Sequence, residues 1–364
     1  MPLIQLDDPD STLAMLRDSV AALATRADGP ATFRRRRAAQ GDLDRATWSA
    51  MAEAGFLALT LPEDMGGMAL GDAELTVLAE ALGRALLTEP FANLAIFPTA
   101  LLQALPRTDA RTELAMGIGS GEAIVPVLWQ DARGATAPLT LSGSRLNGSA
   151  HLVSGALSAT GFLALAQDGD ALVLLHLDAS AEGLRVTTRP GLDGAVLGQV
   201  TLHDTQAGTE LARGAPVQEA LDTAIARTRL ALAAELAGLG ARALEITVEY
   251  TSQRVQFGKT IASFQAIQHR LVDMWAEAEF ACSACTNAAT APSAERAQAV
   301  LAAKARAGDS ATSITRKSIQ LHGAMGFTDQ CDIGLYLKRA ITLNATLGQP
   351  EDLRLAFLAA ERVA

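Results

Sequence analysis

The residues best suited to chemistry gather in the stretch 250–274, which lies between two long apolar helical patterns. Its polar members include Arg254, Gln256 and Gln265, and the aromatic residue Phe257 lies among them. An arginine makes charge-assisted paired hydrogen bonds to phosphate, while amides and a ring add polar contacts and a flat apolar surface. The stretch therefore indicates a helix–turn–helix that could bind a planar ligand carrying phosphate.

The composition describes a large, acidic and mainly helical chain. Its 364 residues suffice for two or three domains with a sizeable core, and the low aromatic content of 4% favours helices over a β-sandwich. The formal net charge of −10 argues against non-specific binding to nucleic acid or to an anionic membrane. Because no apolar run reaches membrane-spanning length and no signal-peptide pattern begins the chain, we expect a cytoplasmic protein.

The apolar periodicity changes twice along the chain and predicts three segments. Residues 1–118 form a helical N-terminal domain, residues 119–214 a small antiparallel β domain, and residues 215–364 a second helical domain. In the last segment the long helical patterns cover residues 217–255, 262–288, 293–322 and 333–346. Helices of this length joined by short turns favour an antiparallel four-helix bundle. The expected fold is mainly α with a small β domain.

Shorter patterns predict local features. The glycines at 117–121 follow a helix rather than a strand, which favours an inter-domain hinge over a phosphate loop. Asn-Gly within 146–149 and Gly-Asp within 168–170 are hairpin signals, and Val200–Leu202 would be the last strand. The four arginines at 34–37 are more typical of a solvated helix face than of a nucleic-acid-binding arm.

The cysteines and histidines do not indicate a metal site. Cys282 and Cys285 form a Cys-x-x-Cys pattern inside a helical stretch, with no second pair that would complete four ligands. Buried structural cysteines are the more typical interpretation. The five histidines share no common spacing, so no metal is expected.

Two motifs resemble those of the acyl-CoA dehydrogenase family. The first joins Arg254–Lys259 to Phe264–His269, and the second is Ile319–Thr328. The loop Leu61–Gly67 is similar to one in that family's N-terminal domain, and the three-part order also matches, so the resemblance covers nearly the whole chain. It implies an FAD-dependent enzyme that oxidises an acyl-CoA thioester and assembles as a dimer or tetramer.

The resemblance implies a composite FAD site, in which bundle helices of one subunit reach the flavin of its neighbour. From the bundle, the residues implied to line the cofactor are Arg254, Gln256, Phe257, Ile261, Phe264, Gln265, Gln320, Leu321, Gly323 and Ala324. In the β domain, Leu128, Trp129 and Ser154 stand where the family has a Thr-Glu-Pro and a Trp-x-Thr segment. The half of the site for the adenine dinucleotide therefore looks intact, and the half for the isoalloxazine ring looks altered.

The family's chemistry also requires a glutamate that removes the α proton of the acyl-CoA. Most members place it at a position that falls here on or near Gly348, and a subgroup places it at a position that falls on Thr228. Glycine has no side chain, and a hydroxyl is too weak a base near neutral pH. Glu351 is close enough to be considered, although an acid after Pro350 is more typical of an exposed first helical turn. The base is therefore not identified.

These observations leave alternatives open. The chain resembles the short subunits of two-component acyl-CoA dehydrogenases, such as those that act on dicarboxylic or steroid-derived acyl-CoAs, which implies a role in fatty acid or steroid side-chain metabolism. That resemblance implies a homodimer or a heterotetramer with a second acyl-CoA dehydrogenase-like subunit, and electron-transfer flavoprotein as the electron acceptor. A catalytically silent binding or scaffold homologue, or a flavoenzyme of the same fold with different chemistry, would also fit, because a fold does not determine a reaction.

Overall fold

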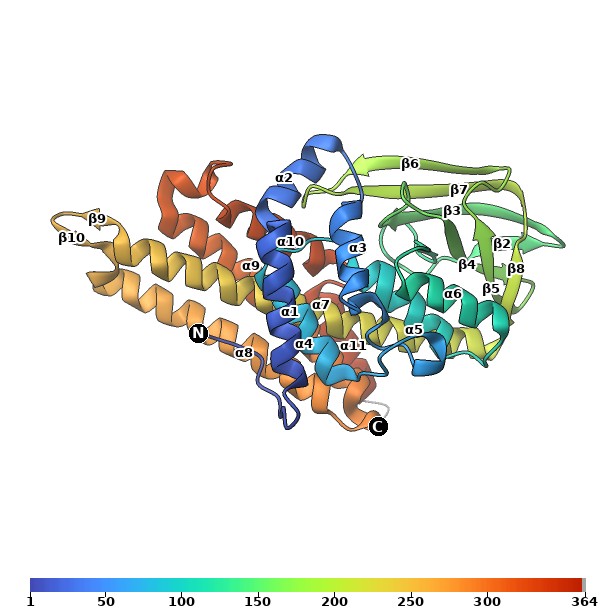
Figure 1. Cartoon of the computed structure of the whole chain (residues 1–364), viewed down its shortest axis with the longest axis horizontal. Helices are drawn as coiled ribbons and strands as arrows, with labels where there is room; N and C mark the ends of the chain where they lie inside the picture. Colours follow the sequence, from blue (N-terminus) through green and yellow to red (C-terminus); the bar gives the residue numbers. More distant parts are fainter. Residues whose placement is uncertain (362–364) are drawn as a thin grey trace. The chain divides into compact units, whose positions relative to one another are not determined.

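The computed structural model describes residues 1–361 and confirms a mainly helical chain with a small β region (Figure 1). The helices of the first third are α1 (Thr12–Ala27), α2 (Gly29–Ala39), α3 (Arg45–Glu53), α4 (Asp72–Arg84), α5 (Phe97–Gln103) and α6 (Asp109–Gly119). Short turns of 3-10 or π-helix lie between them: η1 (Phe56–Ala58), η2 (Glu63–Met65) and η3 (Ala92–Ile96).

The strands follow in one continuous region. They are β1 (Val127–Leu128), β2 (Leu139–Ser142), β3 (Arg145–Val153), β4 (Gly161–Asp168), β5 (Ala171–Asp178), β6 (Leu184–Pro190), β7 (Val196–Gln206) and β8 (Thr209–Arg213). The C-terminal part consists of α7 (Ala215–Gln253), β9 (Val255–Gln256), β10 (Lys259–Thr260), η4 (Ile261–Ser263), α8 (Gln265–Thr290), α9 (Ser293–His322), η5 (Gly323–Phe327), α10 (Ile333–Ala345) and α11 (Pro350–Glu361). These long helices agree with the predicted bundle helices to within a few residues.

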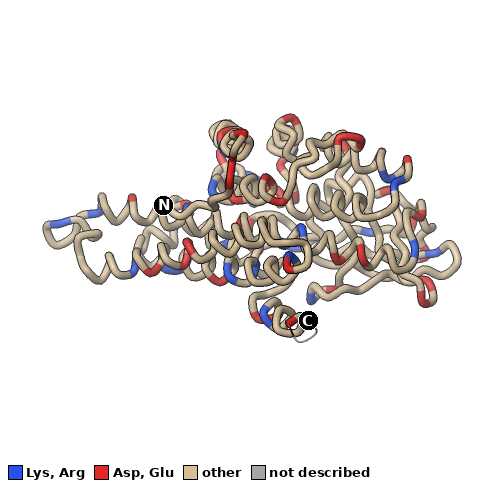
Figure 2. Tube along the Cα trace, turned by 90° about the horizontal axis from the view of Figure 1, so that it is seen from below, with Lys and Arg blue, Asp and Glu red and all other residues tan. Residues whose placement is uncertain are grey.

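The contacts among residues group the chain into two compact units that alternate along the sequence. One contains Met1–Phe33, Asp72–Thr88 and the described chain from Arg229 onward, and the other contains Arg34–Gly71 and Glu89–Thr228. The division into three consecutive domains stays a prediction. Acidic and basic residues are interspersed along the trace (Figure 2), and no helix among residues 1–361 is long and apolar enough to cross a membrane.

The sheet has the strand order β6-β7-β3-β2-β4-β5-β8, with β1 beside β4. Its core is apolar, and Phe162, Leu175 and Val200 are among its fully or almost fully buried side chains. The expectation of a purely antiparallel sheet is wrong, because β4 pairs in parallel with both β1 and β2. The chain crosses over β2 after β3 instead of turning back in a hairpin, so β4 runs in the direction of β2.

Two local predictions in this region are wrong, and one is confirmed. Asn147 and Gly148 lie inside β3, and the hairpin turn falls earlier, where Ser142 pairs with Arg145. Gly148 has φ 132° at a register shift between β3 and β7, so its conformational freedom serves a bulge rather than a turn. Val200–Leu202 lies within β7 and is followed by β8. The hairpin between β4 and β5 is confirmed by the pairing of Asp168 with Ala171.

The predicted glycine hinge is also wrong, because α6 continues through Gly119. A Cβ at Gly119 would lie 2.9 Å from a methyl of Leu61 and 3.1 Å from the Cβ of Ala58. Glycine is therefore used here for close packing of α6 against η1 and not for a bend.

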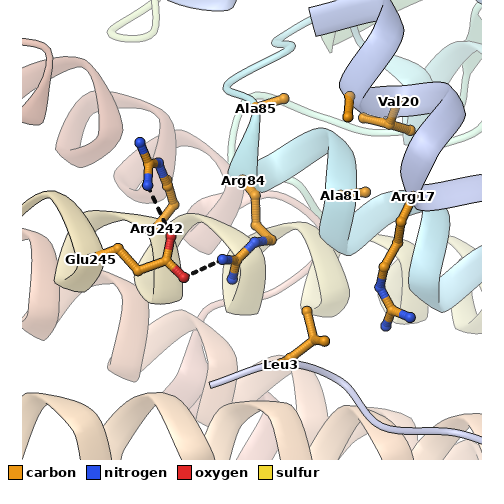
Figure 3. A pocket seen from close by; sticks show the side chains of 9 residues that line it. Leu3, Arg17, Val20, Ala81, Arg84, Ala85, Arg242 and Glu245 are labelled. Carbon is orange, nitrogen blue, oxygen red and sulfur yellow. Dashed lines mark hydrogen bonds and ion pairs between the residues drawn. The ribbon is translucent and has the colours of Figure 1, made fainter. Parts of the chain in front are cut away.

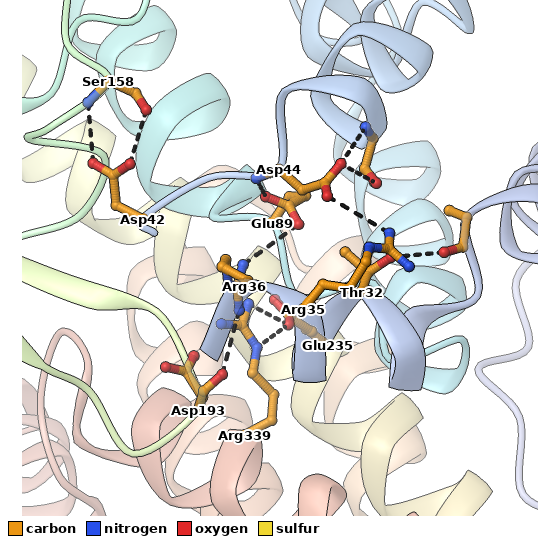
Figure 4. A network of polar contacts seen from close by, with 12 residues as sticks. Thr32, Arg35, Arg36, Asp42, Asp44, Glu89, Ser158, Asp193, Glu235 and Arg339 are labelled. Carbon is orange, nitrogen blue, oxygen red and sulfur yellow. Dashed lines mark hydrogen bonds and ion pairs between the residues drawn. The ribbon is translucent and has the colours of Figure 1, made fainter. Parts of the chain in front are cut away.

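Arg36 is not on a solvated face. Its side chain is 1% exposed, forms an ion pair with Glu89 at 3.4 Å and donates a hydrogen bond to the carbonyl oxygen of Asp193 at 3.3 Å (Figure 4). In the same unit, Asp42 accepts hydrogen bonds from the backbone and the hydroxyl of Ser158. A buried charge needs such partners, because an unpaired one would cost several kcal/mol, typically about 3–5.

Helices α4 and α7 cross where both carry glycine. A Cβ at Gly83 would overlap the carbonyl oxygen of Glu235, and a Cβ at Gly238 would overlap that of Glu80. The missing side chains therefore let the two backbones touch. The side chain of the same Glu235 contacts α10: its carboxylate accepts hydrogen bonds from Nε (2.8 Å) and Nη2 (2.7 Å) of Arg339, and both side chains are nearly buried.

The bundle also encloses a lysine. Lys304 on α9 is 0% exposed, and its Nζ donates to the carbonyl oxygen of Asn344 near the end of α10 at 3.2 Å. Burial, with a smaller contribution from the charge of Arg229, lowers the pKa of Lys304 to about 7. The negative end of the α10 dipole favours the charged amine, but the loss of solvent outweighs that effect.

The helix crossing predicts opposite outcomes for two glycines of α7. Gly238→Ala should lower the free energy of unfolding by about 1–3 kcal/mol, because the new methyl group overlaps the α4 backbone. Gly240→Ala is the matched control, since its Cβ would meet neighbours at an ordinary 3.4 Å and alanine favours the helix. Denaturant unfolding of both variants checks this, and equal losses would contradict the close crossing.

The buried lysine predicts a pH-dependent stability. The pKa of Lys304 is lower in the folded chain than its ordinary value of 10.5, so between about pH 7 and that value the unfolded chain binds more protons. The native protein should therefore gain stability relative to Lys304→Met as the pH rises through this window. Lys317→Met, which removes a 40% exposed side chain of the same helix, is the control in parallel thermal melts. A pH-independent difference for Lys304→Met would contradict a neutral buried amine.

Candidate functional site

A small protruding hairpin joins α7 to α8 (Figure 1). Gln256 pairs with Lys259 across it, and the two residues between them, Phe257 and Gly258, both have positive φ (53° and 81°). Two such residues in succession match a type I′ hairpin turn. The Phe257 side chain is 91% exposed and meets only the edge of Phe264, with ring centroids 6.2 Å apart. The hairpin thus presents an aromatic ring that has little packing of its own.

Arg254 begins this hairpin and is exposed. Its amide donates to the carbonyl of Tyr250 at 2.9 Å, which closes the last turn of α7, and its carbonyl accepts from the amide of Ile261 at 2.8 Å. Within residues 1–361 its guanidinium has no hydrogen-bond or ion-pair partner. The backbone is therefore held on both sides while the charge faces outward, and Gln265 lies nearby as the exposed first residue of α8.

The second motif covers the end of α9 and η5. Gln320 and Ala324 are exposed, whereas Leu321 is buried, so that only the backbone of Leu321 could meet a ligand. Gly323 has φ 62° and ψ −141°, and no atom lies within 4 Å of where its Cβ would stand. Phe327 is 80% exposed. The turn thus combines an open backbone with an exposed ring.

The structure brings the two motifs together. Tyr250, one turn before Arg254, stacks on His322, the last residue of α9, with ring centroids 4.3 Å apart. The unpaired guanidinium, the exposed rings and the open Gly323 turn fit an adenine dinucleotide, which carries a pyrophosphate and a planar base. The residues present in the bundle therefore fit FAD.

The candidates in the β region are more deeply embedded in their own unit. Leu128 is 0% exposed in the sheet core, and Trp129 is 6% exposed with its ring against Phe97 at 5.5 Å. The Ser154 hydroxyl accepts a hydrogen bond from the side-chain amide (Nδ2) of Asn93 at 3.0 Å. Leu152, which stands at the family's tryptophan, is 43% exposed and has φ 56°. These side chains are positioned by packing within the unit, and their role toward a flavin stays a prediction.

The two positions predicted for the base hold no acid. The Thr228 hydroxyl is buried and donates to the carbonyl of Ala224 at 2.7 Å, within α7. Gly348 has φ 110°, and its Cβ would lie 2.8 Å from a methyl of Leu353 and 3.7 Å from Nη2 of Arg229. Glu351 is exposed in the first turn of α11, as expected for an acid that follows Pro350.

Arg229 is the residue that the sequence analysis passed over. Its Nε donates to the carbonyl oxygen of Leu347 at 2.8 Å, so a cation lies beside the position where the family places a carboxylate. Its place next to Thr228 was visible in the sequence. Its reach across 118 positions to Leu347 was not, because that contact depends on how α7 packs against the turn after α10.

A separate cavity of about 320 Å³ lies among α1, α4, α7 and the N-terminal segment (Figure 3). Arg84 forms an ion pair with Glu245 there and donates to the carbonyl of Pro2 at 3.2 Å. Arg17 pairs with Glu80 and donates to the carbonyl of Ile4 at 2.6 Å. These charged side chains hold the N-terminal segment in place.

Residues 1–361 contain no cluster of acidic, histidine or cysteine side chains that could hold a metal ion.

Comparisons with known proteins identify the family of the chain. The family model described as the N-terminal domain of acyl-CoA dehydrogenases matches residues 10–123, and the model described as the C-terminal domain matches residues 218–360. The acyl-CoA dehydrogenase IpdE2 of Mycobacterium tuberculosis (strain ATCC 25618 / H37Rv) is 30% identical over 335 residues, which cover 91% of this chain and 92% of that protein.

Solved structures show the same fold. A variant of the Tcur3481-Tcur3483 steroid ACAD is similar with a TM-score of 0.84 at 26% identity, over 97% of this chain and 99% of that one. The ChsE4-ChsE5 complex from Mycobacterium tuberculosis has a TM-score of 0.86 at 23% identity, over 100% and 99%. FAD, the expected cofactor, is the cofactor of the family that these matches identify. The chain therefore belongs to the acyl-CoA dehydrogenase family.

Proposed function

We propose that this chain is an FAD-binding subunit of an acyl-CoA dehydrogenase that oxidises an acyl-CoA to its 2,3-enoyl thioester and takes its catalytic base from a partner chain. The observation that carries the proposal is a contrast within one bundle. Both motifs for the adenine dinucleotide are accessible and close together, while the base position holds Gly348 beside the guanidinium of Arg229.

The residues that would hold FAD are those of the two motifs. Arg254 and Gln256 would bind the pyrophosphate, and Phe257 would pack near the adenosine end. The Gly323–Ala324 turn would let backbone amides approach the cofactor, because no side chain blocks Gly323. FAD, when bound, accepts the hydrogen that leaves the β carbon as hydride.

The proton of the α carbon needs a carboxylate that this chain does not supply at either expected position. A guanidinium such as that of Arg229 stays protonated and cannot accept the proton. The hydroxyl hydrogen of Thr228 is already donated within its helix. A glutamate of a second acyl-CoA dehydrogenase-like subunit would complete the reaction, which would make the assembly a heterotetramer rather than a homodimer. The ChsE4-ChsE5 complex, a neighbour in fold, supports a two-component assembly.

The acyl group would be steroid-derived, since one structural neighbour above 25% identity is described as a steroid ACAD. A bulky acyl group also fits a pocket formed by two different chains, because the residues that line the pocket can differ between the two chains. Electron-transfer flavoprotein would reoxidise the flavin.

The altered isoalloxazine side, with Leu152 in place of a tryptophan and Trp129 packed on Phe97, favours the catalytically silent homologue as the second candidate.

The proposal predicts a difference between the chain alone and its complex. The purified chain should bind little FAD, or bind it without turnover. When it is co-expressed with a glutamate-bearing acyl-CoA dehydrogenase subunit of the same organism, it should form a yellow complex that reduces an artificial electron acceptor with an acyl-CoA.

Two results would overturn parts of this proposal. Acceptor reduction by the chain alone would show that the base lies in this chain, and Glu351→Gln would then test the one nearby acid. A complex that takes up no FAD under any condition would favour the silent scaffold homologue instead.

Restoring a carboxylate at the base position should fail. Gly348→Glu places a side chain at φ 110° and against Leu353, which should cost about 1–3 kcal/mol of stability without creating activity in the chain alone. Gly214→Glu is the control for backbone strain, since Gly214 has φ 81° with no atom within 4 Å of its Cβ position. A stable Gly348→Glu chain that turns over acyl-CoA would show that only the side chain was missing.

A further inference from the structure

The stacked pair Tyr250 and His322 connects the two motifs without belonging to the set of residues predicted to touch the cofactor. The rings are nearly parallel, with an interplanar angle of 19° and centroids 4.3 Å apart. The Tyr250 hydroxyl also donates to the carbonyl oxygen of His322 at 3.4 Å. Tyr250 therefore contacts both the ring of His322 and the peptide that leads into Gly323.

The hydrogen bond to Ser318 and the burial of His322 favour one neutral tautomer of its ring. Its Nδ1 lies 2.8 Å from the carbonyl oxygen of Ser318, and since that oxygen can only accept, Nδ1 must carry the hydrogen. Burial lowers the pKa of His322, so the neutral ring is favoured, with its Nε2 unprotonated. The imidazole can then neither rotate nor leave the stack without giving up a buried hydrogen bond.

The backbone of each ring residue is linked directly to a predicted phosphate-binding element. The carbonyl of Tyr250 accepts from the amide of Arg254, and the amide of Gly323, directly after His322, donates to the carbonyl of Gln320. A shift of either ring would therefore move the Arg254 hairpin relative to the Gly323 turn. The exposed side chains in both elements have few contacts of their own that could restore the spacing.

We propose that the Tyr250–His322 stack is a positioning device that sets the spacing between the Arg254 hairpin and the Gly323 turn, and that it thereby determines FAD affinity. The inference rests on the proposed function, because it assumes that both elements bind one FAD. Neither residue is a catalytic residue. Both act through the backbone that they hold.

The test is FAD titration of the apo-complex with the partner subunit, followed by flavin fluorescence. Tyr250→Leu and His322→Leu should each weaken FAD binding roughly three- to tenfold, the range expected for loss of one aromatic pair. The double variant should lose no more than the larger single loss, because either change alone removes the stack. Tyr250→Phe keeps the ring and loses only the 3.4 Å hydrogen bond to His322, so its FAD binding should be weakened less than that of Tyr250→Leu.

A matched control separates positioning from general stability. Phe33→Leu also removes a ring from the same unit, and Phe33 is 0% exposed and lies outside both motifs. It should lower the melting temperature without changing FAD affinity. If Tyr250→Leu behaves like Phe33→Leu, or if the two losses of the double variant add, the stack is only structural and the inference is overturned. A native complex that binds no FAD would instead refute the proposed function on which the inference rests.

Discussion

Helix α7 can touch α4 only because Gly83 and Gly238 lack side chains, and much of the bundle depends on that contact. The helix has 39 residues and is therefore about 58 Å long. Side chains of the same helix contact three other segments: Arg229 contacts the turn after α10, Glu235 contacts Arg339, and Tyr250 contacts His322. A shift of α7 would change all three contacts together.

Gly348, the position predicted for the base, lies in the turn after α10, which basic side chains contact. Arg229 and Lys304 donate to the carbonyl oxygens of Leu347 and Asn344, so the turn is held by basic groups from two helices. Beside the guanidinium of Arg229 a carboxylate would be stabilised in its ionised form and would be a weaker base. This agrees with the proposal of a subunit whose base comes from a partner chain.

In the two motifs predicted to bind the cofactor, the side chains are exposed while the backbone is held by contacts within the chain. Arg254, Phe257 and Phe327 face outward with few contacts, as residues that await a ligand or a partner surface would. Their backbones, in contrast, are held by the I′ turn and by the stack of Tyr250 on His322. Binding can then order side chains without having to rearrange the main chain, which lowers its entropic cost.

The sequence by itself determined the helices, the fold class and the family, because apolar periodicity and the two flavin motifs are local patterns that survive any packing. It also shows that Gly348, the position predicted for the base, carries no side chain. Errors arose where a local signal was ambiguous. Asn147-Gly148 has hairpin chemistry, but pairing with β7 extended the strand through it.

Only the tertiary structure decided what surrounds these positions. The burial of Arg36 against Glu89, the parallel pairing of β4, the stack of Tyr250 on His322 and the reach of Arg229 to Leu347 all join residues brought together by packing. The last contact spans 118 positions, a separation at which no periodicity in the sequence carries information. Such contacts depend on how whole helices and strands fit together, and that fit is a property of the folded chain.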